Sequence, residues 1–228
     1  EQTIEFFAAE QTPFAAVILI DSSGSMESRM SMARSAAITF LDGLRADDNA
    51  AIYNFDYKVS LIQDFSNYRD ITERIFDVKA NGMTVLNDAV FEAAQVLSKR
   101  PEKRRAIIVI SDGADTKSKY SADKALKAAI AANATVYTVD MSAIDTNARE
   151  RMQNQSVLKN FAEKSGGKFV AAAGGTALRE AFKEIVGELS SQYTLTYSPT
   201  NKATDGKWRS IEIRVSRPNL NIRTRKGY

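Results

Sequence analysis

The pentapeptide Asp21-Ser22-Ser23-Gly24-Ser25 places an acid and two hydroxyls at alternate positions of one short stretch. Gly24 lets the backbone turn sharply, so the side chains of Asp21, Ser23 and Ser25 can point into one concavity. Three hard oxygen donors suit a small hard cation such as magnesium, manganese or calcium. A polar turn without a ligand explains this pentapeptide equally well, so the rest of the chain must decide between a metal site and a turn.

The composition excludes several kinds of chemistry. The 228 residues include no histidine and no cysteine. This excludes a disulfide framework, a cysteine nucleophile, a histidine general base and an ordinary zinc site. Any metal must therefore be held by carboxylates, hydroxyls, carbonyls and water. Hydrophobic residues make up 44% of the chain, enough for a substantial core, and no apolar run is long enough to span a bilayer.

A predicted buried strand precedes each of two acids that could hold a metal, Asp21 and Asp112. The runs Ala-Ala-Val-Ile-Leu-Ile at 15–20 and Ala-Ile-Ile-Val-Ile at 106–110 are typical of strands inside a parallel sheet. Apolar periodicity and turn residues define the other elements. Strands are predicted over 15–20, 50–55, 58–65, 105–111, 135–139 and 168–172. Helices are predicted over 30–44, 69–79, 87–99, 123–133, 156–165 and 177–189, and a polar loop over 142–154.

This alternation predicts an α/β fold with a doubly wound, mostly parallel sheet and helices on both faces. The pair 50–55 and 58–65 must be antiparallel, because its connection is too short for a crossover. In such a sheet, ligands bind beyond the carboxyl ends of the strands, where the strand order reverses. The strands that end at Asp21 and Asp112 are expected to be neighbours there, and the loop of Thr84 can reach the same crevice. Two acids and three hydroxyls should then converge, which a random polar turn does not predict.

Three segments of the chain resemble the von Willebrand factor type A domain family. They are Asp21-Ser22-Ser23-Gly24-Ser25, Gly82-Met83-Thr84-Val85-Leu86-Asn87-Asp88 and Ser111-Asp112-Gly113, in this order. The resemblance covers residues 13–189 and implies a Rossmann-like fold with a metal-ion-dependent adhesion site. It implies metal-binding roles for Asp21, Ser23, Ser25, Thr84 and Asp112. The hydroxyls are expected to bind the cation directly, and the two carboxylates partly through water.

The family resemblance also implies a function. In the family, an acidic side chain of a partner protein fills the open position of the cation, so we expect a metal-bridged protein–protein contact and no catalysis. One alternative is a scaffold or assembly module in which the metal is purely structural. A metal-dependent hydrolase is disfavoured, because there is no second acid two residues after Asp21, no Walker A sequence and no histidine.

The C-terminal part of the chain differs in pattern from the rest. Residues 192–198 and 209–216 alternate apolar and polar side chains on either side of the turn at Asp205-Gly206, which predicts a β-hairpin. We therefore divide the chain into a von Willebrand factor type A domain over 1–190, with a short N-terminal edge strand, and a hairpin extension over 191–228 packed on it.

Two further features of the C-terminal tail concern its binding partners and the location of the protein. The tail carries eight lysines and arginines against two acids. Because these charges alternate with apolar residues, we interpret them as protection of an edge strand, in preference to a surface for nucleic acid, anionic lipid or an acidic partner. The tail also resembles the ending of a bacterial subgroup of secreted proteins known from acidobacterial genomes, which implies a secreted or periplasmic location.

Other polar residues near the predicted site have more than one interpretation. Asp88 is expected to support the start of its helix or the loop of Thr84 and not to bind the metal. Thr116 is expected to begin the next loop, where it could line the rim of the site. Asp140 follows the strand over 135–139. It could add charge near the metal or pair with Arg149 or Arg151, and we favour the pairing.

Overall fold

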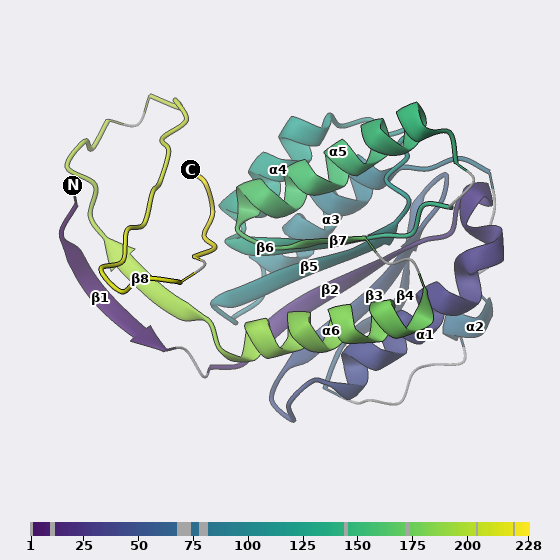
Figure 1. Cartoon of the computed structure of the whole chain (residues 1–228), viewed down its shortest axis with the longest axis horizontal. Helices are drawn as coiled ribbons and strands as arrows, with labels where there is room; N and C mark the ends of the chain where they lie inside the picture. Colours follow the sequence, from purple (N-terminus) through teal and green to yellow (C-terminus); the bar gives the residue numbers. More distant parts are fainter. Residues whose placement is uncertain are drawn as a thin grey trace.

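The structure, a computed structural model, describes residues 2–9, 12–67, 74–77, 82–143, 146–171, 174–203, 205–220 and 222–228. These residues form a six-stranded sheet with the order β4-β3-β2-β5-β6-β7 and a separate two-stranded sheet (Figure 1). The strands of the large sheet are β2 (Phe14–Asp21), β3 (Asn49–Phe55), β4 (Val59–Ser66), β5 (Arg104–Ser111), β6 (Ala134–Asp140) and β7 (Phe169–Ala171).

Strand β2 lies inside the large sheet and is buried along its whole length. It pairs in parallel with β3 on one side and with β5 on the other. Strand β4 pairs with β3 in the antiparallel direction, as its short connection predicted. The doubly wound, mostly parallel sheet is confirmed, and the strands that lead to Asp21 and Asp112 are neighbours.

Helices cover both faces of the large sheet (Figure 1). They are η1 (Gly24–Arg29, a 3₁₀ helix), α1 (Met30–Asp42), α2 (Arg74–Asp77), α3 (Leu86–Ser98), α4 (Ala122–Ala131), α5 (Ala148–Ser165) and α6 (Gly175–Ser190). Side chains of β2 alternate between two cores. Ile18 and Ile20 pack in the core with α1 and α6, whereas Val17 and Leu19 pack in the core with α3, α4 and α5.

One predicted helix is described only in part, and another begins earlier than predicted. The helix expected over 69–79 is described only at α2, and its other residues lie outside the described residues. The helix expected to begin at 156 begins at Ala148, so the prediction of a loop up to 154 was wrong. The side chain of Asn147 caps it by accepting a hydrogen bond from Arg149 N at 2.9 Å. The first turns are polar and mostly solvent-facing, so no apolar period marked them.

The predicted C-terminal hairpin is not formed. Strand β8 (Tyr193–Tyr197) pairs in the antiparallel direction with β1 (Ile4–Ala9), far away in the sequence, and residues 211–215 are in no strand. Strand β1 gives β8 the ladder partner that the sequence pattern required, so a hairpin is not needed. The N-terminal strand thus belongs to the two-stranded sheet and is not an edge of the large one. The division of the chain at residue 190 remains a prediction.

The C-terminal segment contacts the helical layers on both faces of the large sheet. Lys226 N donates a hydrogen bond to Lys164 O of α5 at 3.0 Å. Arg223 forms an ion pair with Glu188 of α6. These contacts hold the segment against the sheet-and-helix body, next to the small β1–β8 sheet (Figure 1). No helix within the described ranges is both long and apolar enough to cross a membrane.

Candidate metal centre

Asp21 is completely buried at the carboxyl end of β2. One carboxylate oxygen, Oδ1, accepts a hydrogen bond from Ser23 N at 2.9 Å. The other, Oδ2, accepts one from Ser111 Oγ at 2.5 Å. Ser111 ends the adjacent strand β5, so two neighbouring strands fix the orientation of this carboxylate. The sequence did not point to this role of Ser111, because the contact joins residues far apart in the chain.

The electrostatic environment of Asp21 favours its neutral form when no cation is present. The pKa of Asp21 is raised from 3.8 to about 6, mainly by burial. The hydrogen bonds from Ser111 and Ser23 lower the pKa, and the charge of nearby Asp112 raises it. Asp21 ends β2 and Asp112 follows the neighbouring strand β5, so both carboxylates lie at the same edge of the sheet. A cation between them would favour the charged forms of both.

Ser23 is the residue directly before η1, and Ser25 lies in the first turn of η1. Their Oγ atoms are 3.1 Å apart. Ser23 is buried and Ser25 is exposed, so this pair of hydroxyls runs from the interior to the solvent. Gly24 N donates a hydrogen bond to Gly82 O at 3.3 Å, which connects this turn to the loop of Thr84.

Thr84 is buried just before α3, and its backbone is fixed by the loop after β5. Thr84 N donates to Thr116 Oγ1 at 2.9 Å. Thr84 O accepts from Thr116 N at 2.9 Å and from Lys117 N at 3.0 Å. Thr116 is therefore a positioning residue for Thr84, whereas the sequence suggested only a loop start or a rim position.

Asp112 follows β5 and is 7% exposed. Its Oδ1 accepts a hydrogen bond from Ala114 N at 3.1 Å, which leaves the other carboxylate oxygen for further partners. The chain then turns at Gly113 with a φ of +83°, and a Cβ atom there would lie 2.6 Å from Asn154 O. Only glycine fits this turn, which allows α5 to approach the site closely.

The structure brings the predicted residues together to different degrees. Asp21 interacts with Asp112, Ser23 contacts Ser25, and the turn of Ser25 is bonded to the loop of Thr84. Across the described ranges, no group of three acidic side chains could hold a metal, so a cation here would depend on two carboxylates and hydroxyls. Such a set of hard oxygens fits magnesium, manganese or calcium. The role of each residue as a ligand stays a prediction.

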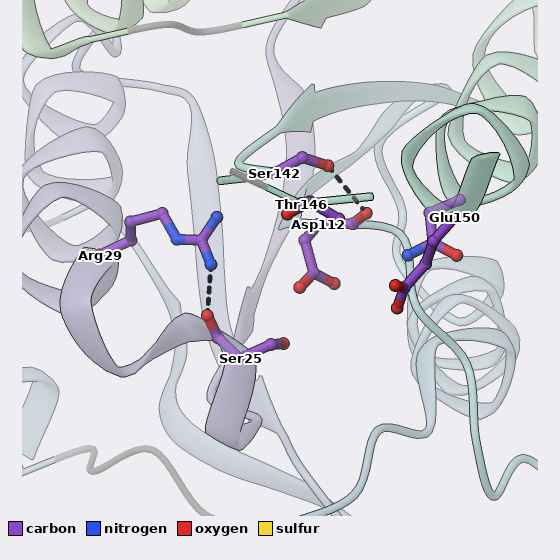
Figure 2. A pocket seen from close by; sticks show the side chains of 7 residues that line it. Ser25, Arg29, Asp112, Ser142, Thr146 and Glu150 are labelled. Atoms are coloured by element: carbon purple, nitrogen blue, oxygen red, sulfur yellow. Dashed lines mark hydrogen bonds between the residues drawn. The ribbon is translucent and has the colours of Figure 1, made fainter. Parts of the chain in front are cut away.

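A cavity of about 290 Å³ opens beside these residues. Arg29 forms part of one wall and donates hydrogen bonds to Ser25 O and Met141 O. Glu150 of α5 lies on the other side of Asp112 (Figure 2). No pattern in the sequence indicated a role for Arg29 or Glu150. The lining residues are Ser25, Arg29, Asp112, Ser142, Thr146, Glu150 and Asn154.

The other acids expected near the site are held by hydrogen bonds. Asp140 accepts from Ser142 N at 2.8 Å, from Ser142 Oγ at 2.6 Å and from Gln155 Nε2 at 2.7 Å. It therefore orders the loop after β6, a role different from the arginine pairing that we favoured. Asp88 accepts from Lys119 N and Tyr120 N, both at 2.9 Å. It thus ties the start of α3 to the loop before α4.

The fold and the sequence place the chain in a class of α/β domains with known members. The vWF domain of the type V pili tip protein Mfa5 from Porphyromonas gingivalis has a TM-score of 0.66 at 14% identity, covering 79% of this chain and 96% of that one. The von Willebrand factor type A protein from Catenulispora acidiphila has a TM-score of 0.64 at 20% identity, covering 78% of this chain and 43% of that one. At these identities the likeness bears on the fold alone.

The sequence comparisons point to one family. The von Willebrand factor type A domain profile matches residues 16–114, and this segment of the chain therefore has the sequence pattern of that family. Inter-alpha-trypsin inhibitor heavy chain H3 from Bos taurus is 30% identical over 127 residues, which cover 48% of this chain and 14% of that protein. An uncharacterized protein from Synechocystis is 28% identical over 106 residues, 44% of this chain and 25% of its own length. The chain thus spans a minor part of both relatives, and the acidobacterial subgroup remains a prediction.

Proposed function

We propose that this chain is a divalent-metal-dependent protein-interaction domain that binds an acidic side chain of a partner. The observation that carries the proposal is the position of two carboxylates, Asp21 and Asp112, at the ends of neighbouring strands beside an open cavity. The cavity is lined by Ser25, a predicted ligand that reaches solvent. We further propose an extracytoplasmic location, since one structural relative is a pilus tip protein.

The residues of the chain have separable roles in this proposal. Ser23, Ser25 and Thr84 would hold the cation through neutral hydroxyls, and the two carboxylates would neutralise its charge. A bound divalent cation would supply an open coordination position for the carboxylate of a partner. Arg29, fixed by two carbonyls at the cavity wall, favours an approaching group that is negatively charged.

A random peptide library displayed on phage tests the proposal. The immobilised protein is panned in magnesium and, in parallel, in EDTA. We expect peptides that are recovered only in magnesium to share an Asp or Glu, and we expect Asp112→Asn to abolish their recovery. The matched control is Asp123→Asn, which removes one exposed carboxylate in the first turn of α4. Equal recovery of the same peptides in EDTA would contradict the proposal.

A second candidate is a scaffold in which the cation is structural and other surfaces make the contacts. It is favoured by one observation, the exposed apolar side chains of the β1–β8 sheet. Phe7 and Tyr193 are 63% and 66% exposed, and their rings stack with centroids 5.3 Å apart. If the chain is such a scaffold, we expect EDTA to lower the melting temperature and to leave peptide recovery unchanged.

A further inference from the structure

The cavity beside the candidate metal centre carries charges of both signs. Arg29 and Glu150 line it on opposite sides of Asp112 (Figure 2). The remaining lining side chains are hydroxyls and an amide. At about 290 Å³ the cavity lies at the lower end of the volumes of small-molecule pockets, so it suits one or two side chains of a partner more than a whole cofactor.

The two charged walls differ in how they are held. The Arg29 guanidinium donates to Ser25 O and Met141 O, so its position is fixed by the site itself. Glu150 is exposed, and no hydrogen bond or ion pair joins its side chain to the other residues that the structure describes. Its carboxylate is therefore available to a ligand that enters the cavity.

Glu150 is not placed as an additional metal ligand. Asp21, Asp112 and Glu150 do not form a metal-holding group of three acids in the described part of the chain. Glu150 also lies in the first turn of α5, where an acid interacts favourably with the helix dipole. The dipole explains an acid at this position but not its place in the cavity, since an exposed acid elsewhere in that turn would serve the helix equally well.

We propose that Glu150 selects partners in which a lysine or arginine lies close to the acidic residue that reaches the cation. This inference rests on the proposed function. The acidic group of the partner lies towards Arg29 and the metal centre, and the basic group lies towards Glu150. The opposite walls then fix the orientation of the bound segment, because a reversed segment would bring like charges together on both sides.

The peptide pool recovered in magnesium provides the first test. We expect its members to carry a Lys or Arg within about three residues of the Asp or Glu, since the cavity adjoins the centre and an extended chain advances about 3.3 Å per residue. Panning on Glu150→Gln should still enrich acids but not bases. An acidic pool without a basic residue would overturn this inference alone, whereas a pool without acids would overturn the proposed function as well.

One recovered peptide provides the quantitative test. We expect Glu150→Gln to weaken its binding about fivefold, as for a partly exposed ion pair, and to leave binding of the same peptide with its base changed to alanine unaltered. Glu163→Gln is the matched control, since Glu163 is an exposed acid on the same helix outside the cavity lining. Equal binding by the wild type and Glu150→Gln would overturn the inference. A loss of manganese affinity in Glu150→Gln without peptide would also overturn it, because Glu150 would then act on the metal.

Discussion

Asp21 combines complete burial, two hydrogen bonds that favour its charged form, and a neighbouring carboxylate that opposes that form. Burial is the largest of these effects and raises its pKa to about 6. A cation at this site must displace the proton that the carboxylate holds at lower pH. The residue is thus both the proposed anchor of the metal centre and its pH-sensitive part.

The affinity for manganese should fall as the pH falls through about 6, the pKa of Asp21. Below this pH, one competing proton lowers the affinity by roughly tenfold per pH unit. Calorimetric titrations at pH 7 and pH 5 measure this change. The same affinity at both values would show that Asp21 does not govern metal binding.

Asp21→Asn should abolish metal binding and yet stabilise the metal-free protein at pH 7. The pKa is about 6 when folded and 3.8 in the reference state, so the unfolded chain loses its proton first as the pH rises. The free energy of unfolding of the metal-free wild type therefore falls between about pH 4 and pH 6 and is lowest above that range. We expect Asp21→Asn to raise the free energy of unfolding of the metal-free protein by about 1–3 kcal/mol at pH 7.

Urea denaturation in EDTA measures this difference, and a repeat near pH 4 is its control. At that pH the difference between the wild type and Asp21→Asn should largely vanish, because the aspartate is then mostly protonated in the folded protein. If Asp21→Asn raised the free energy of unfolding equally at both pH values, the cause would instead be a change in packing.

The sequence predicted the five candidate ligands but not the residues that hold them. Asp21, Ser23 and Ser25 form one local pattern, which is why their types and spacing could be interpreted. Ser111 and Thr116 act through hydrogen bonds to residues distant in sequence, and these depend on strand pairing and loop geometry. No local pattern announces such contacts.

At the scale of single elements, the loop of Thr84 depends on the loop after β5. Thr116→Val removes the hydroxyl that accepts the hydrogen bond of Thr84 N. An amide left without its acceptor costs about 1–3 kcal/mol, so we expect a loss of stability of that size in EDTA. We also expect a weaker manganese affinity, because the position of Thr84 is less fixed.

Thr39→Val is the matched control, since among the described residues the hydroxyl of Thr39 bonds within its own helix, to Ser35 O. Urea denaturation and manganese titration of both variants separate the two effects. Unchanged stability and affinity in Thr116→Val would contradict the role assigned to Thr116.

The buried strands and helix segments were the ones that could be predicted from the sequence. Strands β2 and β5 are buried nearly throughout, and their apolar runs were evident in the sequence. Helix α5 was predicted only in its second half, where Leu158 and Phe161 are buried. Its polar first half carries Glu150 and Asn154 into the cavity, so the least periodic part of the helix is the part that lines the candidate site.

At the scale of the whole molecule, the two cores and the small sheet are built from different parts of the chain. Both cores consist of residues between Phe14 and Leu189, whereas β1 and β8 pair outside them. The alternation of strands and helices predicted the large sheet. The partner of β8 could not be decided from sequence, because two segments were candidates. The segment at β1 is prone to form a strand, and the segment 209–216 alternates apolar and polar residues.

Deletion of residues 1–9 should therefore expose the amides of β8 but leave the large sheet intact. Hydrogen exchange followed by mass spectrometry measures both regions in one experiment. We expect β8 to lose its protection and β2 and β5 to keep theirs, because neither core contains residues from β1. Faster exchange in β2 as well would show that the small sheet supports the whole domain.

We expect a divalent cation to bind where the loops after β2 and β5 meet the loop before α3. A crystal soaked in manganese tests this directly, because anomalous scattering locates the ion. An anomalous peak should lie within bonding distance of Ser25 Oγ and close to Thr84 and Asp112. An ordered site without a peak at saturating manganese would contradict the proposed metal centre.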